Sequence, residues 1–315
     1  MGRPFRFGVM CFEAPSRAAW NDLARKAEAL GYATFVMADH YLNPFTPVAG
    51  LVAAADATST IRIGCQVFDN DFRHPALLAK EAAMLDVMTD GRFEFGLGAG
   101  WSKLEYDQVG IPFDPPAVRV ARMEEGLQII KTLWCGGPVT HQGTYYTLKG
   151  FECTPRPVQR PHPPVLLGGG GKRVLQFAAR EADIVGIVPK ARPGGGLDWV
   201  GSNAATLDTQ IGWVREAAGE RLARLELDVI AHAVAVTDYP RAAAEEVARR
   251  HPYGQDACGL TPDQVLASPD YLIGSVDEIV ERLQAQRERY GIARVTVYQK
   301  DLDMMAPVVA RLAGR

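Results

Sequence analysis

The sequence predicts an α/β protein, a (β/α)8 TIM barrel with a small insertion after its fourth helix. Runs typical of strands alternate with runs that have the 3.6-residue period of amphipathic helices. Eight such units fall within 315 residues, and this barrel usually takes about 250 residues with insertions tolerated. A doubly wound sheet is the competing architecture, but it normally carries a glycine-rich turn after its first strand. The first strand-like run here ends in Met10, Cys11 and Phe12 without a glycine, which favours the barrel.

The predicted strands are short apolar runs rich in β-branched and aromatic residues. They lie at 5–12, 33–39, 61–68, 92–98, 164–169, 183–188, 227–236 and 294–298. Capping residues mark the helices: Ser16 and Gly31 enclose the first, and Ser275 with Glu278 forms a capping box. The predicted helices lie at 16–31, 48–58, 75–88, 120–134, 172–182, near 206–222, near 240–250, at 275–291 and at 304–314.

Two segments interrupt this alternation. Residues 135–163 are rich in Gly, Pro and Thr, which predicts a small hairpin and an extended connection. We interpret this segment as an insertion within a single domain that covers residues 1–315. Residues 251–274 are predicted to be irregular.

Composition argues against several classes of protein. The net charge of −3 lacks the basic excess of nucleic-acid or membrane-surface binders, and no apolar run reaches the roughly 18 residues of a membrane helix. The N-terminus has no signal-peptide layout, and the five cysteines form no C-x-x-C, so we expect a cytoplasmic protein. The six histidines lack the spacings of metal ligands, so we expect no metal.

In a barrel of this kind, the active site lies at the carboxyl ends of the strands. The fifth predicted strand ends in Gly168–Gly171, directly before a helix that starts with Lys172 and Arg173. Free backbone N–H groups at a helix N-terminus bind anions, and glycine lets a phosphate approach closely. We therefore predict phosphate binding at Gly169, Gly170 and Gly171, with a flexible turn as the alternative.

Other strand ends offer polar side chains. The second ends in Asp39-His40, where an acid beside an imidazole can place the histidine as an acid or base, although a histidine packed in the barrel wall is the alternative. Glu105 is a candidate proton donor or a solvated loop acid. Two further residues are assigned to the rim and the substrate pocket: His74, which also suits a helix cap, and Trp101.

The stretch "GRFEFGLGAGW", residues 91–101, is not a dinucleotide fingerprint, because its glycines alternate instead of following G-x-G-x-x-G. Side chains alternate along a strand, so Phe93, Phe95 and Leu97 face one side. Gly96, Gly98 and Gly100 lie on the other side, where they leave room for a planar ring or for close packing beneath it.

These motifs, in this order, resemble the bacterial luciferase-like monooxygenase superfamily. The resemblance covers nearly the whole chain and is most specific in "IRIGCQVFDNDFRHPALLAKEAAMLDVMTDGRFEFGLGAGW" (61–101), with "ADHY" and "LLGGGGKRV" also matching. It implies a (β/α)8 barrel that uses FMN or the deazaflavin coenzyme F420. Asp-His in place of Glu-His-His at the second strand is similar to the F420-dependent oxidoreductases of actinobacteria.

Site residues also follow from the resemblance. It implies that Asp39 lies against the deazaflavin and that His40 handles a proton or stabilises the reduced ring. It implies a cis peptide between Gln66 and Val67, beside Cys65, that supports the back face of the ring. Trp101 stands where some F420-dependent dehydrogenases have a glutamate, which argues against a sugar-phosphate substrate.

The predicted function is hydride transfer between F420 and a small organic substrate, bound under the loops at 101–116 and 189–204. The alternatives are an FMN-dependent monooxygenase that uses reduced flavin and O2, and a non-catalytic protein that binds or stores F420. We expect a homodimer, because members of the family are often homodimers.

Overall fold

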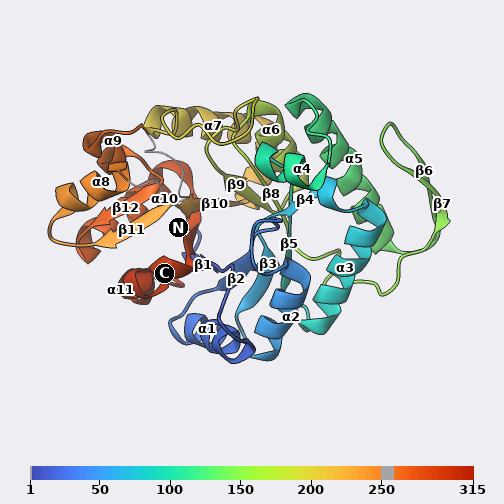
Figure 1. Ribbon diagram of the computed structural model, residues 1–315, viewed down its shortest axis with the longest axis horizontal. Coiled ribbons are helices and arrows are strands. Elements are labelled where there is room, and N and C mark those ends of the chain that lie inside the picture. The colour runs from blue at the N-terminus through green and yellow to red at the C-terminus, as the bar shows by residue number, and fades with distance from the viewer. Residues whose placement is uncertain (1, 250–258) are drawn as a thin grey trace.

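Eight parallel strands close into a barrel in the computed structural model, which describes residues 2–249 and 259–315 (Figure 1). Each strand is hydrogen-bonded to two neighbours, and β13 pairs with β1 to complete the ring. This confirms the predicted barrel. In order around it, the strands are β1 (Arg6–Met10), β2 (Thr34–Met37), β3 (Arg62–Cys65), β5 (Phe93–Gly98), β8 (Val165–Gly169), β9 (Ile184–Ile187), β10 (Glu226–Ala231) and β13 (Ile292–Tyr298).

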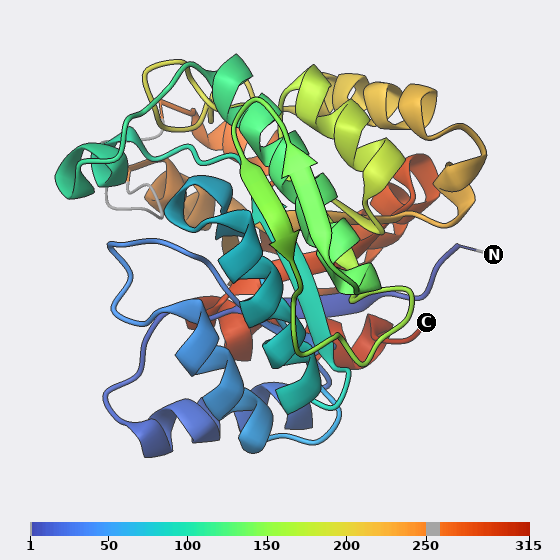
Figure 2. The same cartoon turned by 90° about the vertical axis from the view of Figure 1, so that its right-hand side faces the viewer.

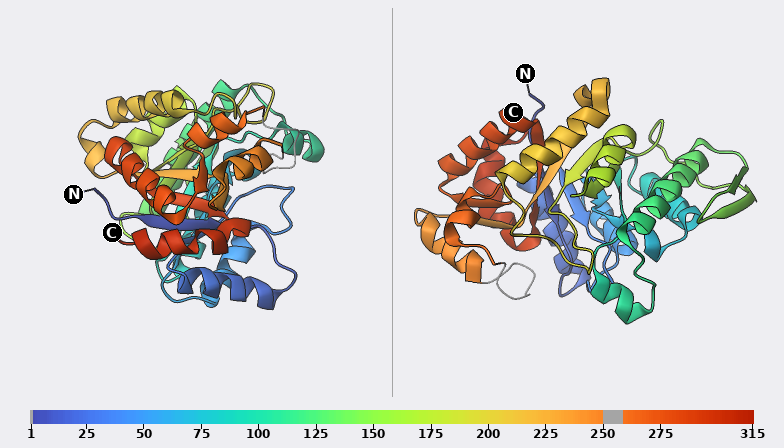
Figure 3. Two further views of the ribbon diagram at one scale, coloured as in Figure 1. Left: turned by 90° about the vertical axis from the view of Figure 1, so that its left-hand side faces the viewer. Right: turned by 90° about the horizontal axis from the view of Figure 1, so that it is seen from above.

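Helices surround the strands, as Figure 3 shows from two sides. The predicted caps are present: the Ser16 hydroxyl accepts a hydrogen bond from the Ala19 N–H at 3.2 Å, and Ser275 and Glu278 form the capping box. The helices are α1 (Arg17–Ala29), α2 (Pro47–Asp56), α3 (Pro75–Met88), α4 (Lys103–Val109), α5 (Pro116–Cys135), α6 (Lys172–Glu181), α7 (Ala204–Ala218), α8 (Pro240–Arg249), α9 (Pro262–Ala267), α10 (Val276–Tyr290) and α11 (Leu302–Leu312). Short 3-10 turns lie at Asn70–Phe72, Gly219–Ala223 and Gln299–Asp301.

The insertion after α5 contains an antiparallel hairpin, as predicted. Its strands β6 (Val139–Gln142) and β7 (Thr147–Phe151) lie outside the ring of helices, at the front of the view in Figure 2. The Tyr146 hydroxyl accepts a hydrogen bond from the Asn70 amide at 3.0 Å, which fastens the hairpin to the turn after β4 (Phe68–Asp69).

The chain after β10 differs from the prediction. We expected one strand over 227–236, but the run divides: β11 (Ala233–Val236) leaves the barrel and pairs with β12 (Tyr271–Gly274). Residues 251–274 were predicted to be irregular, yet α9 and β12 lie within this segment; 250–258 fall outside the described residues. The added pair has its own apolar cluster with α8 and α9, including Ala244, Val265 and Ile273. This packing joins separate segments of the chain, so the local hydrophobic pattern of the sequence does not reveal it.

The outward face of β5 carries the aromatic residues of its alternating pattern. Phe95 meets Trp134 of α5 edge-on, with ring centroids 5.1 Å apart, and Phe93 and Leu97 are fully buried. Aromatic packing of this kind attaches the strand to the helices outside it. None of the helices in the described part of the chain has both the length and the apolar character needed to cross a membrane.

Candidate active site

A cavity of about 1130 Å³ lies at the carboxyl ends of the barrel strands. This is the end at which such barrels carry their active sites. Every barrel strand, or the residue just after it, contributes to the lining, represented by Met10, Ala38, Gln66, Gly98, Gly168, Gly186, Ile230 and Tyr298.

His40 and Glu105 meet at this cavity. His40 Nδ1 and Glu105 Oε2 are 2.7 Å apart, and Glu105 Oε1 accepts a hydrogen bond from the Leu42 N–H at 3.1 Å. Burial raises the pKa of the Glu105 carboxyl, but the hydrogen bond and charge of His40 outweigh it, and the net pKa lies below its ordinary value. An ionised Glu105 holds the proton of His40 on Nδ1, which leaves Nε2 for proton exchange.

Glu105 is therefore not a solvated loop acid. It lies on α4, a helix that the sequence pattern did not predict, and its side chain is 2% exposed. Trp101 lines the cavity beside this pair and meets the His40 ring edge-on, with centroids 5.6 Å apart. The structure thus brings three predicted site residues together.

Asp39 lines the cavity but its carboxylate is already engaged. Arg73 binds both carboxylate oxygens, and the Asp69 N–H donates to Asp39 Oδ2 at 3.2 Å. Arg73 also pairs with Glu81 of α3 at 3.1 Å. Through Arg73, Asp39 therefore anchors the end of β2 to the start of α3. The sequence did not reveal this role of Arg73.

Asp69 is a buried acid in the lining that sequence reasoning missed. The Tyr106 hydroxyl lies 3.0 Å from both of its carboxylate oxygens, and the Asp71 N–H donates to Oδ1 at 2.9 Å. Burial, together with the negative charges of Asp71 and Asp39, raises its pKa to about 7 against the lowering effect of these hydrogen bonds. The signal available in the sequence was the acid-rich run "FDND" at the end of the third strand.

The floor of the cavity contains the cis peptide between Gln66 and Val67 that the resemblance implied. The Val67 side chain packs toward β5: a Cβ on Gly98 would lie 2.6 Å from Val67 Cγ2, and one on Gly96 only 2.0 Å from the carbonyl oxygen of Cys65. The alternating glycines of β5 therefore serve close packing beneath the cavity.

Gly100 follows β5, and Cys65 is the last residue of β3. Gly100 has φ of +73°, and a Cβ there would lie 2.0 Å from the Tyr106 hydroxyl, so both its conformation and its surroundings require glycine. Cys65, expected at the cofactor, is buried in β3 outside the cavity lining, and burial raises the pKa of its thiol well above the ordinary value. It fills space behind the floor.

Gly169, Gly170 and Gly171, for which phosphate binding was predicted, line the cavity at the end of β8. A Cβ on Gly170 would lie 2.5 Å from the carbonyl oxygen of Val188, whereas Gly171 faces open space. Gly171 is the N-cap of α6 and places no side chain over the helix end. The first N–H groups of α6 can therefore donate hydrogen bonds to an anion.

Two residues singled out in the sequence are engaged by other partners. Arg173 of α6 is among the lining residues, but its guanidinium binds Glu124 at 2.6 Å. His74, assigned to the substrate pocket, is not among the lining residues. Its Nδ1 accepts a hydrogen bond from the Ala76 N–H at 3.2 Å, and its ring packs edge-on against Tyr146. His74 is thus the cap of α3, the other role considered for it.

A second imidazole lines the cavity and was also missed. His232, directly after β10, has Nδ1 3.1 Å from the Tyr298 hydroxyl at the end of β13.

Arg119 also lines the cavity, and its guanidinium binds the carbonyl oxygens of Ala99 and Gly100 and stacks on Phe113. Across the described ranges, no group of three or more His, Cys, Asp or Glu side chains is arranged to hold a metal ion.

Comparison with known proteins identifies the family. The model of the luciferase-like monooxygenase family matches residues 5–294. The chain belongs to this family. The match runs from β1 into the start of β13 and includes the floor, the His40–Glu105 pair and the glycine turn.

Relatives within the family use different cofactors. Over 171 residues the chain is 32% identical to the F420-dependent glucose-6-phosphate dehydrogenase of Microbacterium testaceum, covering 51% of this chain and 50% of the relative. Over 109 residues it is 33% identical to the FMNH2-dependent dimethylsulfone monooxygenase of Pseudomonas putida, covering 35% and 30%. The chain therefore spans about half or less of the length of these relatives.

Solved structures share the fold over nearly the whole chain. The F420-dependent tetrahydromethanopterin reductase of Methanopyrus kandleri superposes with a TM-score of 0.78 at 20% identity, covering 98% of this chain and 99% of that one. This likeness supports the barrel architecture. The family match and the shared fold together make the protein a member of the luciferase-like monooxygenase family built on a parallel β-barrel.

Proposed function

We propose that the protein is an F420-dependent oxidoreductase that transfers a hydride between the deazaflavin and a small organic substrate. The observation that carries this proposal is the end of β2, where Asp39-His40 takes the place of Glu-His-His and His40 is hydrogen-bonded to buried Glu105 at the cavity. When bound, F420 supplies hydride transfer at its C5 carbon.

The residues present fit such a cofactor. The floor at Gln66 and Val67 would support the back of the ring, and the glycine turn before α6 would hold the phosphate. His40 would then exchange a proton through Nε2, with Glu105 holding its ring. Trp101, edge-on to His40, would form one wall of the substrate pocket.

An FMN-dependent monooxygenase is the second candidate. It is favoured by the similarity to the FMNH2-dependent dimethylsulfone monooxygenase, and the same floor and glycine turn suit the ring and phosphate of FMN. A protein that binds or stores F420 without catalysis is the third.

Titration of the purified protein with F420, and separately with FMN, distinguishes these candidates. We expect F420 to bind more tightly than FMN and to be reduced or oxidised with at least one member of a panel of alcohols and carbonyl compounds. Tight FMN binding without an F420 response would contradict the proposal. F420 binding without turnover across the panel would favour storage.

Replacement of His40 tests its role. We expect His40→Ala to lower turnover by about 100-fold or more, as loss of an acid–base group does, while the dissociation constant for F420 changes only a few-fold. His74→Ala is the matched control, because His74 caps α3 outside the cavity lining. Unchanged turnover in His40→Ala would remove the proposed proton transfer.

A homodimer remains part of the proposal. Sedimentation equilibrium at micromolar concentration should give twice the chain mass of 34.3 kDa, and a monomer would contradict it.

A further inference from the structure

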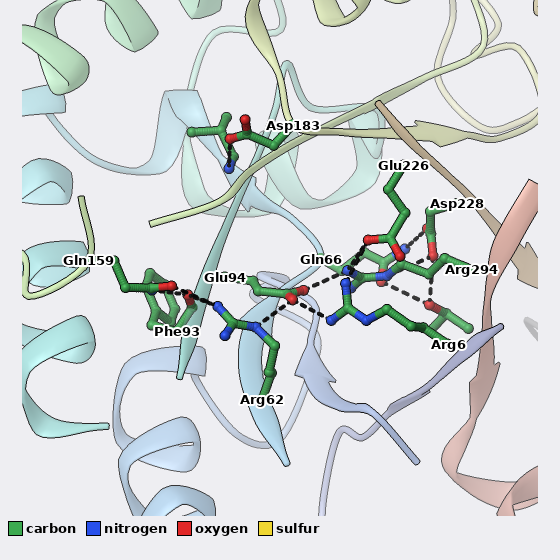
Figure 4. A network of polar contacts seen from close by, with 12 residues as sticks. Arg6, Arg62, Gln66, Phe93, Glu94, Gln159, Asp183, Glu226, Asp228 and Arg294 are labelled. Carbon is green, nitrogen blue, oxygen red and sulfur yellow. Dashed lines mark hydrogen bonds and ion pairs between the residues drawn. The ribbon is translucent and has the colours of Figure 1, made fainter. Parts of the chain in front are cut away.

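Gln66 lines the cavity, yet its side-chain amide is hydrogen-bonded inside the barrel (Figure 4). Its Nε2 donates to Asp228 Oδ2 at 2.6 Å, and its Oε1 lies 3.2 Å from the Thr296 hydroxyl. Gln66 directly follows β3, whereas Asp228 and Thr296 lie on β10 and β13. Because β3 lies opposite β10 in the barrel order, this side chain joins two sides of the interior beneath the cavity floor.

Both partners of Gln66 are themselves held in place. Asp228 and Thr296 are fully buried, and the Thr296 hydroxyl is 3.1 Å from Asp228 Oδ1. Asp228 Oδ1 also pairs with Arg294 Nε at 3.1 Å, and Arg294 in turn pairs with Glu94 at 2.6 Å. Figure 4 shows Gln66, Asp228, Arg294 and Glu94 within one network of polar contacts.

The charge on Asp228 strengthens this arrangement. Burial raises the pKa of Asp228 to about 6, against the lowering effects of Arg294, Thr296 and Gln66. The hydrogen bond from the Gln66 amide therefore stabilises the charged carboxylate, and that carboxylate is a stronger acceptor than a neutral group.

We propose that Asp228 and Thr296 are positioning residues for the cofactor, because they hold Gln66 down and so keep the floor at Gln66 and Val67 in place. A buried amide without partners costs about 1–3 kcal/mol. Without Asp228 or Thr296, the Gln66 amide would turn toward the cavity, where water can satisfy it and where it would occupy the space of the ring. The inference rests on the proposed function only in that a ring-shaped cofactor lies on this floor.

Thr296 offers a clean test, because valine has nearly the same shape as threonine. Thr296→Val removes the hydroxyl, and we expect the dissociation constant for F420 to rise about 5- to 20-fold, the effect of one lost buried hydrogen bond. Thr296→Ser keeps the hydroxyl and its hydrogen bond, so its dissociation constant for F420 should stay within about twofold of the native value. Asp228→Asn should also raise the dissociation constant for F420. Binding is followed by cofactor fluorescence, and folding by the thermal unfolding midpoint.

Glu226→Gln is the matched control within the same network. The Glu226 carboxylate pairs with Arg6 at 2.6 Å and approaches Arg294 at 3.7 Å, and it is Asp228 that accepts from Gln66. We expect Glu226→Gln to lower the unfolding midpoint but to leave the dissociation constant unchanged. If it weakens binding as much as Thr296→Val does, general loosening of the barrel explains both results and the proposal is overturned.

The remaining outcomes separate this proposal from the proposed function. Native affinity for F420 in Thr296→Val overturns the positioning role while the F420 assignment stands. If the native protein binds FMN instead, the F420 assignment fails, and the same variants titrated with FMN decide the positioning role by the same criterion. A native protein that binds neither cofactor overturns both.

Discussion

Glu105 shows how strongly the role of one side chain depends on its surroundings. By sequence it was either a proton donor or a solvated loop acid. The structure places it on α4, 2% exposed, with one oxygen 2.7 Å from His40 Nδ1 and the other bonded to the Leu42 N–H. An ionised carboxylate in this position orients the imidazole, which makes Glu105 a partner of His40 instead of an independent acid.

Glu105→Gln tests this orienting role. An amide in place of the carboxylate no longer fixes the proton on Nδ1, so we expect kcat to fall roughly 10- to 100-fold with a smaller change in KM. Steady-state kinetics with the substrate found by the panel measures this. Glu125→Gln is the control, because Glu125 forms a similar pair with His141 at 3.1 Å on the hairpin, outside the cavity lining. Equal losses in both variants would argue against a specific role for Glu105.

At the scale of the element, β5 shows what a glycine-rich strand does. Its alternation was correctly interpreted as a strand, with Phe93, Phe95 and Leu97 on the helix side. The pattern alone left open whether the glycines make room for a ring or for packing. The 2.0 Å separation between a Gly96 Cβ and the carbonyl oxygen of Cys65 decides for packing, because backbone from β3 occupies that space.

Gly96→Ala should therefore destabilise the fold. The added methyl group meets backbone that cannot move aside as a side chain could, and we expect the free energy of unfolding to fall by about 3 kcal/mol or more. Gly212→Ala in α7 is the comparison, because a Cβ there meets nothing within 4 Å. In a helix interior that change should stabilise by about 0.5–1 kcal/mol. Urea unfolding of both variants measures the contrast, and a tolerated Gly96→Ala would contradict the packing.

At the scale of the whole molecule, the interior of the barrel is divided between two kinds of contact. The carboxyl half opens into the cavity, whereas the other half contains a buried ion network. Glu94 of β5 pairs there with Arg6, Arg62 and Arg294 at 2.6, 2.7 and 2.6 Å. These four residues come from β1, β3, β5 and β13, so the network ties strands that are far apart in the sequence.

Glu94→Gln should destabilise the protein by about 3–5 kcal/mol, as loss of one partner of a buried ion pair does, because it removes the carboxylate shared by buried Arg294 and the partly buried Arg6 and Arg62. Burial raises the pKa of Glu94, but the three arginines outweigh it and lower the net pKa. Its contribution is therefore present at neutral pH and is lost as pH falls below the ordinary range of a glutamate carboxyl.

Asp22→Asn provides the contrast at the surface. Asp22 pairs with Arg25 in a contact whose side chains are 73% and 56% exposed, and such pairs contribute only about 0.2–1 kcal/mol. Chemical denaturation at neutral pH compares the two variants. Similar losses in both would contradict the structural importance of the buried network.

The sequence by itself determined the barrel, its insertion, the family and the main strand-end motifs. Hydrophobic period, capping residues and glycine runs are local features, and each of them acts within a few residues of chain. Only the tertiary structure decided which side chains meet. The pairing of His40 with Glu105, the engagement of Asp39 by Arg73 and the bond from Gln66 to Asp228 all join separate strand ends or helices. The strand β12 was decided in the same way, because hydrogen-bond partners of this kind depend on which parts of the chain the fold brings together.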